Sequence, residues 1–250
     1  SNTLQGDLGI STSMNKPVID VVADPLKNTI LISFISISIS FVISIIVGIK
    51  SAVHRGKAFD KFWQVFSLVG MSMPTLLISI LLIYFFAIKL KIFPTGGMPI
   101  TGATTGLALI PEWFSYATLP IITLTIGSFA TTIRYVRNAM IEVLSSDYIR
   151  TAKAKGLSNK VIIYQHAFRN ALIPVVTILA GSIVGLFGGA AITEGIFSWN
   201  GIGNVIVSAV SGRDFMLVLA MNMMFAVISL ASNIIMDIGY AFVDPRVKLD

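Results

Sequence analysis

The 250-residue sequence contains no cysteine and only two histidines. Without cysteine, the chain has no disulfide bonds, no thiolate metal ligands and no cysteine nucleophile. His54 and His166 lie far apart, and neither belongs to an HExxH pattern, so the sequence offers no zinc-binding motif. We therefore predict no metal site in this chain.

Charged residues are also scarce. They make up 12% of the chain, whereas soluble domains carry about 25%. Hydrophobic residues make up 55%, and the mean hydropathy is +0.85. Because about 20 apolar residues in a helix cross the roughly 30 Å hydrocarbon core, long uncharged windows predict spanning helices. Five windows qualify, and they indicate an all-α, polytopic membrane protein: residues 28–49, 62–88, 113–133, 170–193 and 215–236.

Small residues recur at four-residue intervals in two of these windows. On a helix such residues form a stripe that lets a second helix approach closely. The first window contains Ser36, Ser40, Ser44 and Gly48, and the fourth contains Gly181, Gly185 and Gly189. These stripes predict helix packing rather than a transport site.

Two segments depart from a plain spanning helix. Pro74 lies within the second window and predicts a kink, because proline removes a backbone hydrogen bond and clashes with the preceding turn. Residues 195–212 are uncharged, as in a spanning helix, yet Trp199, Asn200 and Gly201 suit a turn. We predict an external loop or a partly re-entrant segment there, since a sixth span would place the basic carboxyl end outside.

The basic residues predict the topology. Lys and Arg fall 13 to 5 on alternate sides of the five windows, and the richer side is cytoplasmic by the positive-inside rule. We expect residues 1–27 to be a polar extracytoplasmic lead, residues 28–243 the membrane domain and residues 244–250 a cytoplasmic tail. The lead lacks a signal-peptide pattern, so we expect a sixth, exporting helix upstream of residue 1.

One cytoplasmic stretch, DYIRTAKAKGLSNKV at residues 147–161, is unusually polar for this chain. Apolar residues at helical spacing predict an amphipathic helix over residues 138–155. Gly156 is expected to end it in the left-handed conformation, and Ser158 to cap a second helix that continues through Phe168. The pattern predicts a helix, a tight corner and a helix. By itself it fits docking to a partner, adsorption to anionic lipid, or an ordinary basic loop.

This stretch and most of the chain resemble the permease subunits of ABC importers for peptides, the oligopeptide/dipeptide family within the binding-protein-dependent transport systems. The family's loop reads close to YVRTARAKGLS, then a basic helix, then RNALIPVVT; here the residues read YIRTAKAKGLS and, from Arg169, RNALIPVVT. The resemblance continues in GDLG at residues 6–9, EGIFSWNGIG from Glu194, RDF from Arg213 and DPR from Asp244. It covers nearly all 250 residues.

The resemblance implies the fold of a type I ABC importer permease and a non-catalytic role. It implies that the cytoplasmic coupling loop at residues 138–170 docks through residues 147–170 on separate ATPase subunits, which hold the ATP and magnesium, while this chain binds no cofactor. The implied partners are two ATPase subunits, a second permease, an extracytoplasmic binding protein and the bilayer of the cell membrane, with no nucleic acid. The implied coupling residues are Tyr148, Arg150, Thr151, Ala152, Lys153, Lys155, Gly156, Leu157 and Ser158.

The sequence departs from the family at Asn200, where proline is usual, and at Met216. Both positions are expected outside the membrane, so they bear on contacts with the delivering protein. The family also has an additional amino-terminal span, which matches the upstream helix expected above.

Other residues offer weaker signals. The HRGKAF segment at residues 54–59 lacks P-loop spacing, so ATP hydrolysis is assigned to a partner. Asn222 and Asn233 are eleven residues apart in the last window, close to one helical face, and are candidates for the translocation path. Arg134 and Arg137 are interpreted chiefly as interface anchors, and Asp237 as structural.

The cargo predicted from the resemblance is a peptide, with dipeptides, nickel or glutathione as alternatives. A secondary carrier or channel is a rival from another class, but ionisable residues are nearly absent from the windows, whereas proton-driven carriers generally need them. A simple membrane anchor is a third alternative, and five or six spans exceed what an anchor requires.

Overall fold

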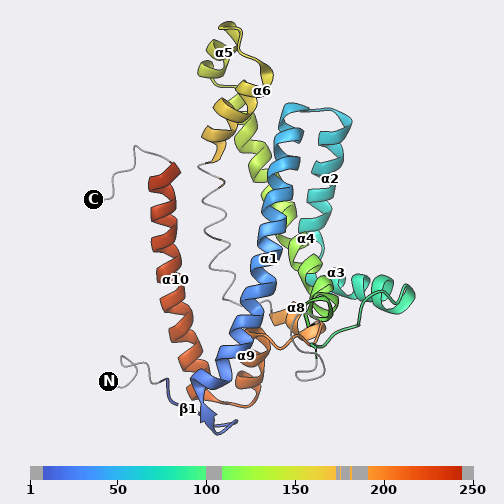
Figure 1. The fold of residues 1–250 in the computed structure, drawn as a ribbon, viewed down its shortest axis with the longest axis vertical. Coiled ribbons are helices and arrows are strands. Elements are labelled where there is room, and N and C mark those ends of the chain that lie inside the picture. The colour runs from blue at the N-terminus through green and yellow to red at the C-terminus, as the bar shows by residue number, and fades with distance from the viewer. Residues whose placement is uncertain (1–7, 100–108, 173–174, 176–180, 182–190, 244–250) are drawn as a thin grey trace. The chain divides into compact units, whose positions relative to one another are not determined.

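The computed structural model describes residues 8–99, 109–172, 175, 181 and 191–243 (Figure 1). These residues are mainly helical, with one short antiparallel hairpin. In chain order the elements are β1 (Ile10–Ser11), β2 (Lys16–Pro17), α1 (Val18–Val53), α2 (Ala58–Ser72), α3 (Thr75–Leu82), η2 (Ile83–Lys89), α4 (Leu109–Leu144), α5 (Asp147–Ala154), α6 (Asn159–Val161), η4 (Ile162–Phe168), α8 (Ala191–Ile196), α9 (Ile202–Ser211) and α10 (Phe215–Val243).

The chain divides into two compact units, and α1, α4 and α10 contribute to both. The first unit comprises Ser1–Ser36, Pro74–Thr125 and Val184–Ala231, and the second comprises Ile37–Met73, Ile126–Ile183 and Ser232–Asp250. Within the first unit, Ile10 pairs with Pro17 and Ser11 with Lys16 in the hairpin that precedes α1.

Helices α1 and α4 are long and apolar enough to cross a membrane. Each has 36 residues, which corresponds to about 54 Å of helix against a hydrocarbon core of roughly 30 Å. They confirm the first and third predicted spans, and α10 begins at Phe215 as predicted for the fifth. Most of the fourth predicted span, including Gly185 and Gly189, lies outside the described residues.

The first long helix begins earlier in the chain than the first predicted span. Helix α1 begins at Val18, ten residues before the predicted start at Asn28. Val18 and Val22, one helical turn apart, are both buried in a cluster with apolar residues of α9 and α10. Tertiary packing therefore extends the helix into a segment whose composition had indicated a loop.

The second predicted span is broken rather than kinked. Helix α2 ends at Ser72 and α3 begins at Thr75. Met73 and Pro74 between them have extended backbones, with ψ values of 126° and 137°. Pro74 removes one helical hydrogen bond and disfavours a helical conformation at the residue before it, which accounts for the interruption. If α2, α3 and η2 count as one span, the described residues contain up to three spans.

The first small-residue stripe packs as predicted, and its partner is α4. Ser36, Ser40 and Ser44 are all buried. In the first unit the Ser36 hydroxyl donates to the carbonyl oxygens of Ile32 and Ile121. In the second unit a Cβ on Gly48 would lie 2.7 Å from side-chain atoms of Val136. Glycine is therefore required where α1 packs against Val136 of α4.

Residues 195–212, predicted as an external loop or a partly re-entrant segment, are largely helical, which corrects the loop alternative. Its ten-residue helix α9 measures about 15 Å, too short to cross the hydrocarbon core. The expectation that it does not form a sixth span is therefore consistent with its length. Within the first unit, its buried Ile202, Val205 and Ala209 pack against residues at the starts of α1 and α10.

Candidate functional site

The predicted amphipathic helix over residues 138–155 consists of two helices, so that prediction is wrong in its extent. Helix α4 continues to Leu144, and α5 begins at Asp147. At the break, the Ser145 hydroxyl donates to the carbonyl oxygen of Glu142 at 2.7 Å, and the Ser146 hydroxyl donates to that of Val143 at 2.6 Å. Serine side chains that bond nearby backbone groups compete with the helical ladder, which explains the break here.

The corner after α5 has the predicted glycine geometry. Gly156 has a φ of +75°, in the left-handed region. Its N–H donates to the carbonyl oxygen of Lys153 at 3.0 Å, and the N–H of Leu157 donates to that of Ala152 at 3.4 Å. These two bonds are the pair that defines a Schellman helix end. The prediction that Gly156 terminates the helix is confirmed.

The second arm of the corner starts with the predicted cap. The Ser158 hydroxyl accepts a hydrogen bond from the N–H of Val161 at 3.5 Å. Helix α6 follows and continues as the π-helix η4 through Phe168. The loop is therefore built from α5, a tight corner, and the α6–η4 arm, as Figure 1 shows for the segment beyond the end of α4.

Both arms are anchored in the core of the second unit. Ile149 and Ala152 of α5, and Ile162 and Ala167 of η4, are at most 8% exposed. They share one apolar cluster with residues from the carboxyl ends of α1 and α4: Ile49, Ala52, Val136, Ala139 and Met140. A force applied to the loop therefore reaches both long helices through packed side chains rather than through flexible chain.

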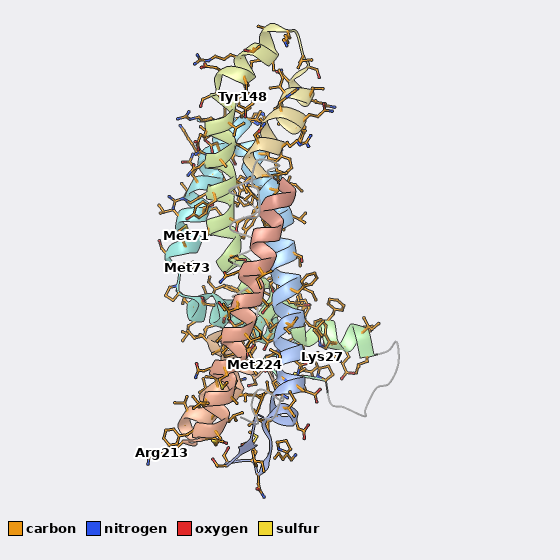
Figure 2. All side chains as sticks on the ribbon, turned by 90° about the vertical axis from the view of Figure 1, so that its left-hand side faces the viewer. Lys27, Met71, Met73, Tyr148, Arg213 and Met224 are labelled. Carbon is orange, nitrogen blue, oxygen red and sulfur yellow. The ribbon has the colours of Figure 1, made fainter. Side chains whose placement is uncertain are left out.

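The outer face of the loop is exposed and carries both aromatic and basic groups. Eight of the nine predicted coupling residues are exposed, whereas Ala152 points into the core. Tyr148 on α5, labelled in Figure 2, is 45% exposed and Leu157 is 39% exposed. We call the exposed set the loop surface: Tyr148, Arg150, Thr151, Lys153, Lys155, Gly156, Leu157 and Ser158.

The charges of the loop surface are available to a partner. The Arg150 guanidinium lies 3.3 Å from the Asp147 carboxylate, and both side chains are largely exposed. An exposed pair of this kind contributes about 0–1 kcal/mol, so it holds Arg150 only weakly. Tyr164 on η4, which was not among the nine predicted residues, is 58% exposed. It adds a second exposed tyrosine to the loop, on the α6–η4 arm.

The two path candidates lie on α10 and are both exposed. The Asn222 amide donates to the carbonyl oxygen of Val218 in its own helix at 2.9 Å. Their role in a translocation path stays a prediction.

The interpretation of Arg137 as an interface anchor is wrong. Its Nε and Nη2 donate to the two carboxylate oxygens of Asp60, at 2.6 and 2.8 Å. Asp60 is fully buried, and its Oδ2 also accepts from the N–H of Gly56 at 2.8 Å. The pair fastens the start of α2 to α4 within the second unit. Arg134 is exposed and contacts the sulfur of Met71 at 3.4 Å instead.

Glu194, named above only as the first residue of EGIFSWNGIG, makes several buried hydrogen bonds within the first unit. It is fully buried and accepts hydrogen bonds from the Thr29 hydroxyl at 2.6 Å and from the N–H of Gly203 at 2.7 Å. A Cβ on Gly201 would lie 2.4 Å from its carboxylate. Gly201 and Gly203 of EGIFSWNGIG are therefore needed so that the backbone can approach a buried carboxylate.

Asp214 was also missed, although its position just before α10 is that of a helix N-cap. It accepts hydrogen bonds from the hydroxyls of Ser11 and Ser13 and from the N–H groups of Ser13 and Leu217. Burial alone would raise the pKa of Asp214, but these hydrogen bonds outweigh burial and hold the pKa below its ordinary value. The carboxylate ties the β1–β2 hairpin to the start of α10.

Comparison with known proteins gives a consistent result. A family model described as "Binding-protein-dependent transport system inner membrane component" matches residues 29–249. A protein of Brucella suis biovar 1 named as a peptide permease is 38% identical over 248 residues, which cover 98% of this chain and 76% of that protein. The oligopeptide transport system permease protein AppB of Bacillus subtilis is 34% identical over 248 residues, covering 99% and 78% respectively.

Among solved structures, one chain of the MetNI methionine ABC transporter, in an inward facing conformation, has a TM-score of 0.67 to this chain. The match covers 94% of this chain and 100% of that one. At 19% sequence identity, this likeness shows a shared fold and nothing more specific.

Proposed function

Because the chain belongs to the family of binding-protein-dependent transport system inner membrane components, we propose that it is the membrane-spanning subunit of an ATP-driven importer of peptides, driven through the loop surface. The similarity to peptide permeases over nearly the whole chain supports the peptide cargo. The structure of the loop supports the coupling role. Its two helical arms have an exposed outer face, and their inner faces pack against α1 and α4 in one apolar cluster.

The importer as we propose it needs partners that this chain does not supply. ATP and magnesium are bound by two separate ATPase subunits, and a homologous second permease completes the translocation path. An extracytoplasmic binding protein delivers the peptide. The loop surface and the carboxyl end face the cytoplasm, since the basic residues concentrate on that side.

The proposed coupling follows from the packing. An ATPase subunit that grips Tyr148 and Leu157 moves α5 and the α6–η4 arm as one body, because both arms share a single apolar cluster. The same cluster contains Ile49 of α1 and Met140 of α4, so movement of the loop displaces the cytoplasmic ends of both helices. Closure of the ATP-bound subunits thereby changes access to the peptide path.

Replacement of Gly156 by valine tests this role. Among the residues that the structure describes, no neighbouring atom lies within 4 Å of the added Cβ, so the variant strains the backbone without a clash. A side chain in the left-handed conformation costs about 1–2 kcal/mol, and a β-branched residue is disfavoured further. Relaxation of that strain rotates one arm against the other. We expect loss of labelled-peptide uptake and weaker co-purification of the ATPase subunits, with normal membrane insertion.

Gly56→Val is the matched control. Gly56 has a φ of +80°, also has no atom within 4 Å of an added Cβ, and lies in the loop between α1 and α2. It carries the same backbone strain outside the loop surface. Uptake and ATPase association should survive in this control. If Gly156→Val retains both as well, the docking role of the 147–170 loop is wrong.

A further inference from the structure

A groove of about 470 Å³ lies in the second unit, between the carboxyl-terminal part of α1 and η4. Its volume falls within the range of pockets that hold small ligands. Most of its lining is apolar, and three side chains are basic: Ile45, Ile46, Ile49, Val53, Ile163, Tyr164 and Phe168 form the apolar part, and Lys50, His54 and Lys160 the basic part. The groove is separate from the loop surface.

The groove is polar at one end only. On α1, the basic residues Lys50 and His54 follow Ile45 and Ile46 toward the carboxyl end of the helix. On the other wall, Lys160 precedes the apolar residues of η4. Since η4 leads from the loop toward the fourth predicted span, both walls place their basic groups at the end nearer the loop. Ile45, Ile46 and Phe168 lie deeper along the two walls.

The basic end is suited to an anion. No acidic side chain lines the groove in the part of the chain that the structure describes, and within that part neither Lys50 nor Lys160 has a carboxylate within 4 Å. The Lys50 ammonium lies 4.7 Å from the centre of the Phe59 ring. His54 Nδ1 lies 2.9 Å from the carbonyl oxygen of Lys50 and donates to it, which leaves Nε2 facing away from that bond.

We propose that this groove binds an anionic phospholipid, with the phosphate between Lys50 and Lys160 and an acyl chain along the isoleucines of α1 and Phe168. An amphiphile with a negative headgroup matches a groove that is basic at one end and apolar along its length, and basic pockets between membrane helices on the cytoplasmic side bind such headgroups. The proposal rests on the proposed function only for its assignment of this end to the cytoplasmic leaflet.

The location of the lipid gives it a regulatory consequence. The α6–η4 arm continues directly from the corner at Gly156 and Ser158, so a lipid in the groove lies between α1 and this second arm of the loop. It thereby holds that arm against α1 and influences how movement of the loop is transmitted to α1.

Lipid retention by the purified complete importer tests the proposal. The complex is equilibrated in nanodiscs of phosphatidylglycerol or phosphatidylcholine with the same acyl chains, extracted into mild detergent, and analysed for bound lipid by native mass spectrometry. The wild type should retain phosphatidylglycerol and not phosphatidylcholine. Lys50→Glu/Lys160→Glu should reduce retention by about tenfold or more, because both headgroup contacts become repulsive.

Arg55→Glu/Lys57→Glu is the matched control, since it makes the same change in net charge at exposed residues of the α1–α2 loop outside the groove. It should retain phosphatidylglycerol like the wild type. Equal retention of the two lipids by the wild type, or undiminished retention in Lys50→Glu/Lys160→Glu, would overturn the proposal. Neither readout depends on transport or ATP hydrolysis, so failure here is distinguishable from failure of the proposed function.

Discussion

Removal of the Arg137 guanidinium should be among the most destabilising single changes in the second unit. Asp60 is fully buried, the Arg137 side chain is 14% exposed, and two hydrogen bonds of 2.6 and 2.8 Å join them. Arg137→Met leaves the Asp60 carboxylate buried without its guanidinium partner, although the Gly56 N–H still donates to it. Breaking a buried pair in this way costs about 3–5 kcal/mol.

The double variant Asp60→Asn/Arg137→Met separates two contributions to the loss of stability. One is the lost attraction between Asp60 and Arg137, and the other is the cost of leaving the Asp60 carboxylate buried without a positive partner. Asparagine keeps an acceptor for the Gly56 N–H, and neither charge remains. We expect it to recover about 0.5–3 kcal/mol relative to Arg137→Met, the usual size of coupling between residues in contact. A double variant less stable than Arg137→Met would refute this reasoning.

Thermal unfolding of the detergent-purified protein measures these differences. A loss of 3–5 kcal/mol corresponds to a decrease in Tm of roughly 6–20 °C for a chain of this size. Arg134→Met is the control, because Arg134 is exposed on the same helix and contacts only the Met71 sulfur among the described polar groups. If Arg137→Met unfolds at the same temperature as Arg134→Met, the pair does not stabilise the junction of α2 and α4.

Two further predictions concern the first unit. Gly203→Ala should lower stability by about 1–3 kcal/mol, because its Cβ would lie 2.5 Å from the Cα of Ala191. The control Gly127→Ala, in the second unit, should not, because the described residues place no neighbouring atom within 4 Å of the added Cβ. Equal Tm values for the two variants would contradict this. Asp214 has a lowered pKa, so its stabilising contribution is present above the ordinary aspartate value near pH 4 and is lost as the pH falls below it. The Tm difference between wild type and Asp214→Asn should therefore shrink in thermal unfolding below about pH 4, whereas a difference that stays constant to pH 2 would refute the assignment.

Much of the candidate site was predictable because its signals are local. The corner at Gly156 needs a left-handed residue between two helical segments, and Ser158 needs only its own oxygen and an N–H three residues later. Interactions over three to five residues are encoded directly in the order of residue types. The break at Ser145 and Ser146 was missed, although its hydrogen bonds are equally local, because the apolar spacing of residues 138–155 fits a continuous helix.

The sequence by itself determined that this chain crosses a membrane, where its long apolar helices lie, and where the loop turns, because hydrophobic length and helix-end chemistry depend on neighbouring residues. Only the tertiary structure decided which charges are buried and paired. Asp60 and Arg137 are 77 residues apart, and Thr29 and Glu194 are 165 apart. A charge can be buried only where packing places a suitable partner beside it. Because that partner is distant in the chain, the residues next to the charge in sequence do not reveal it.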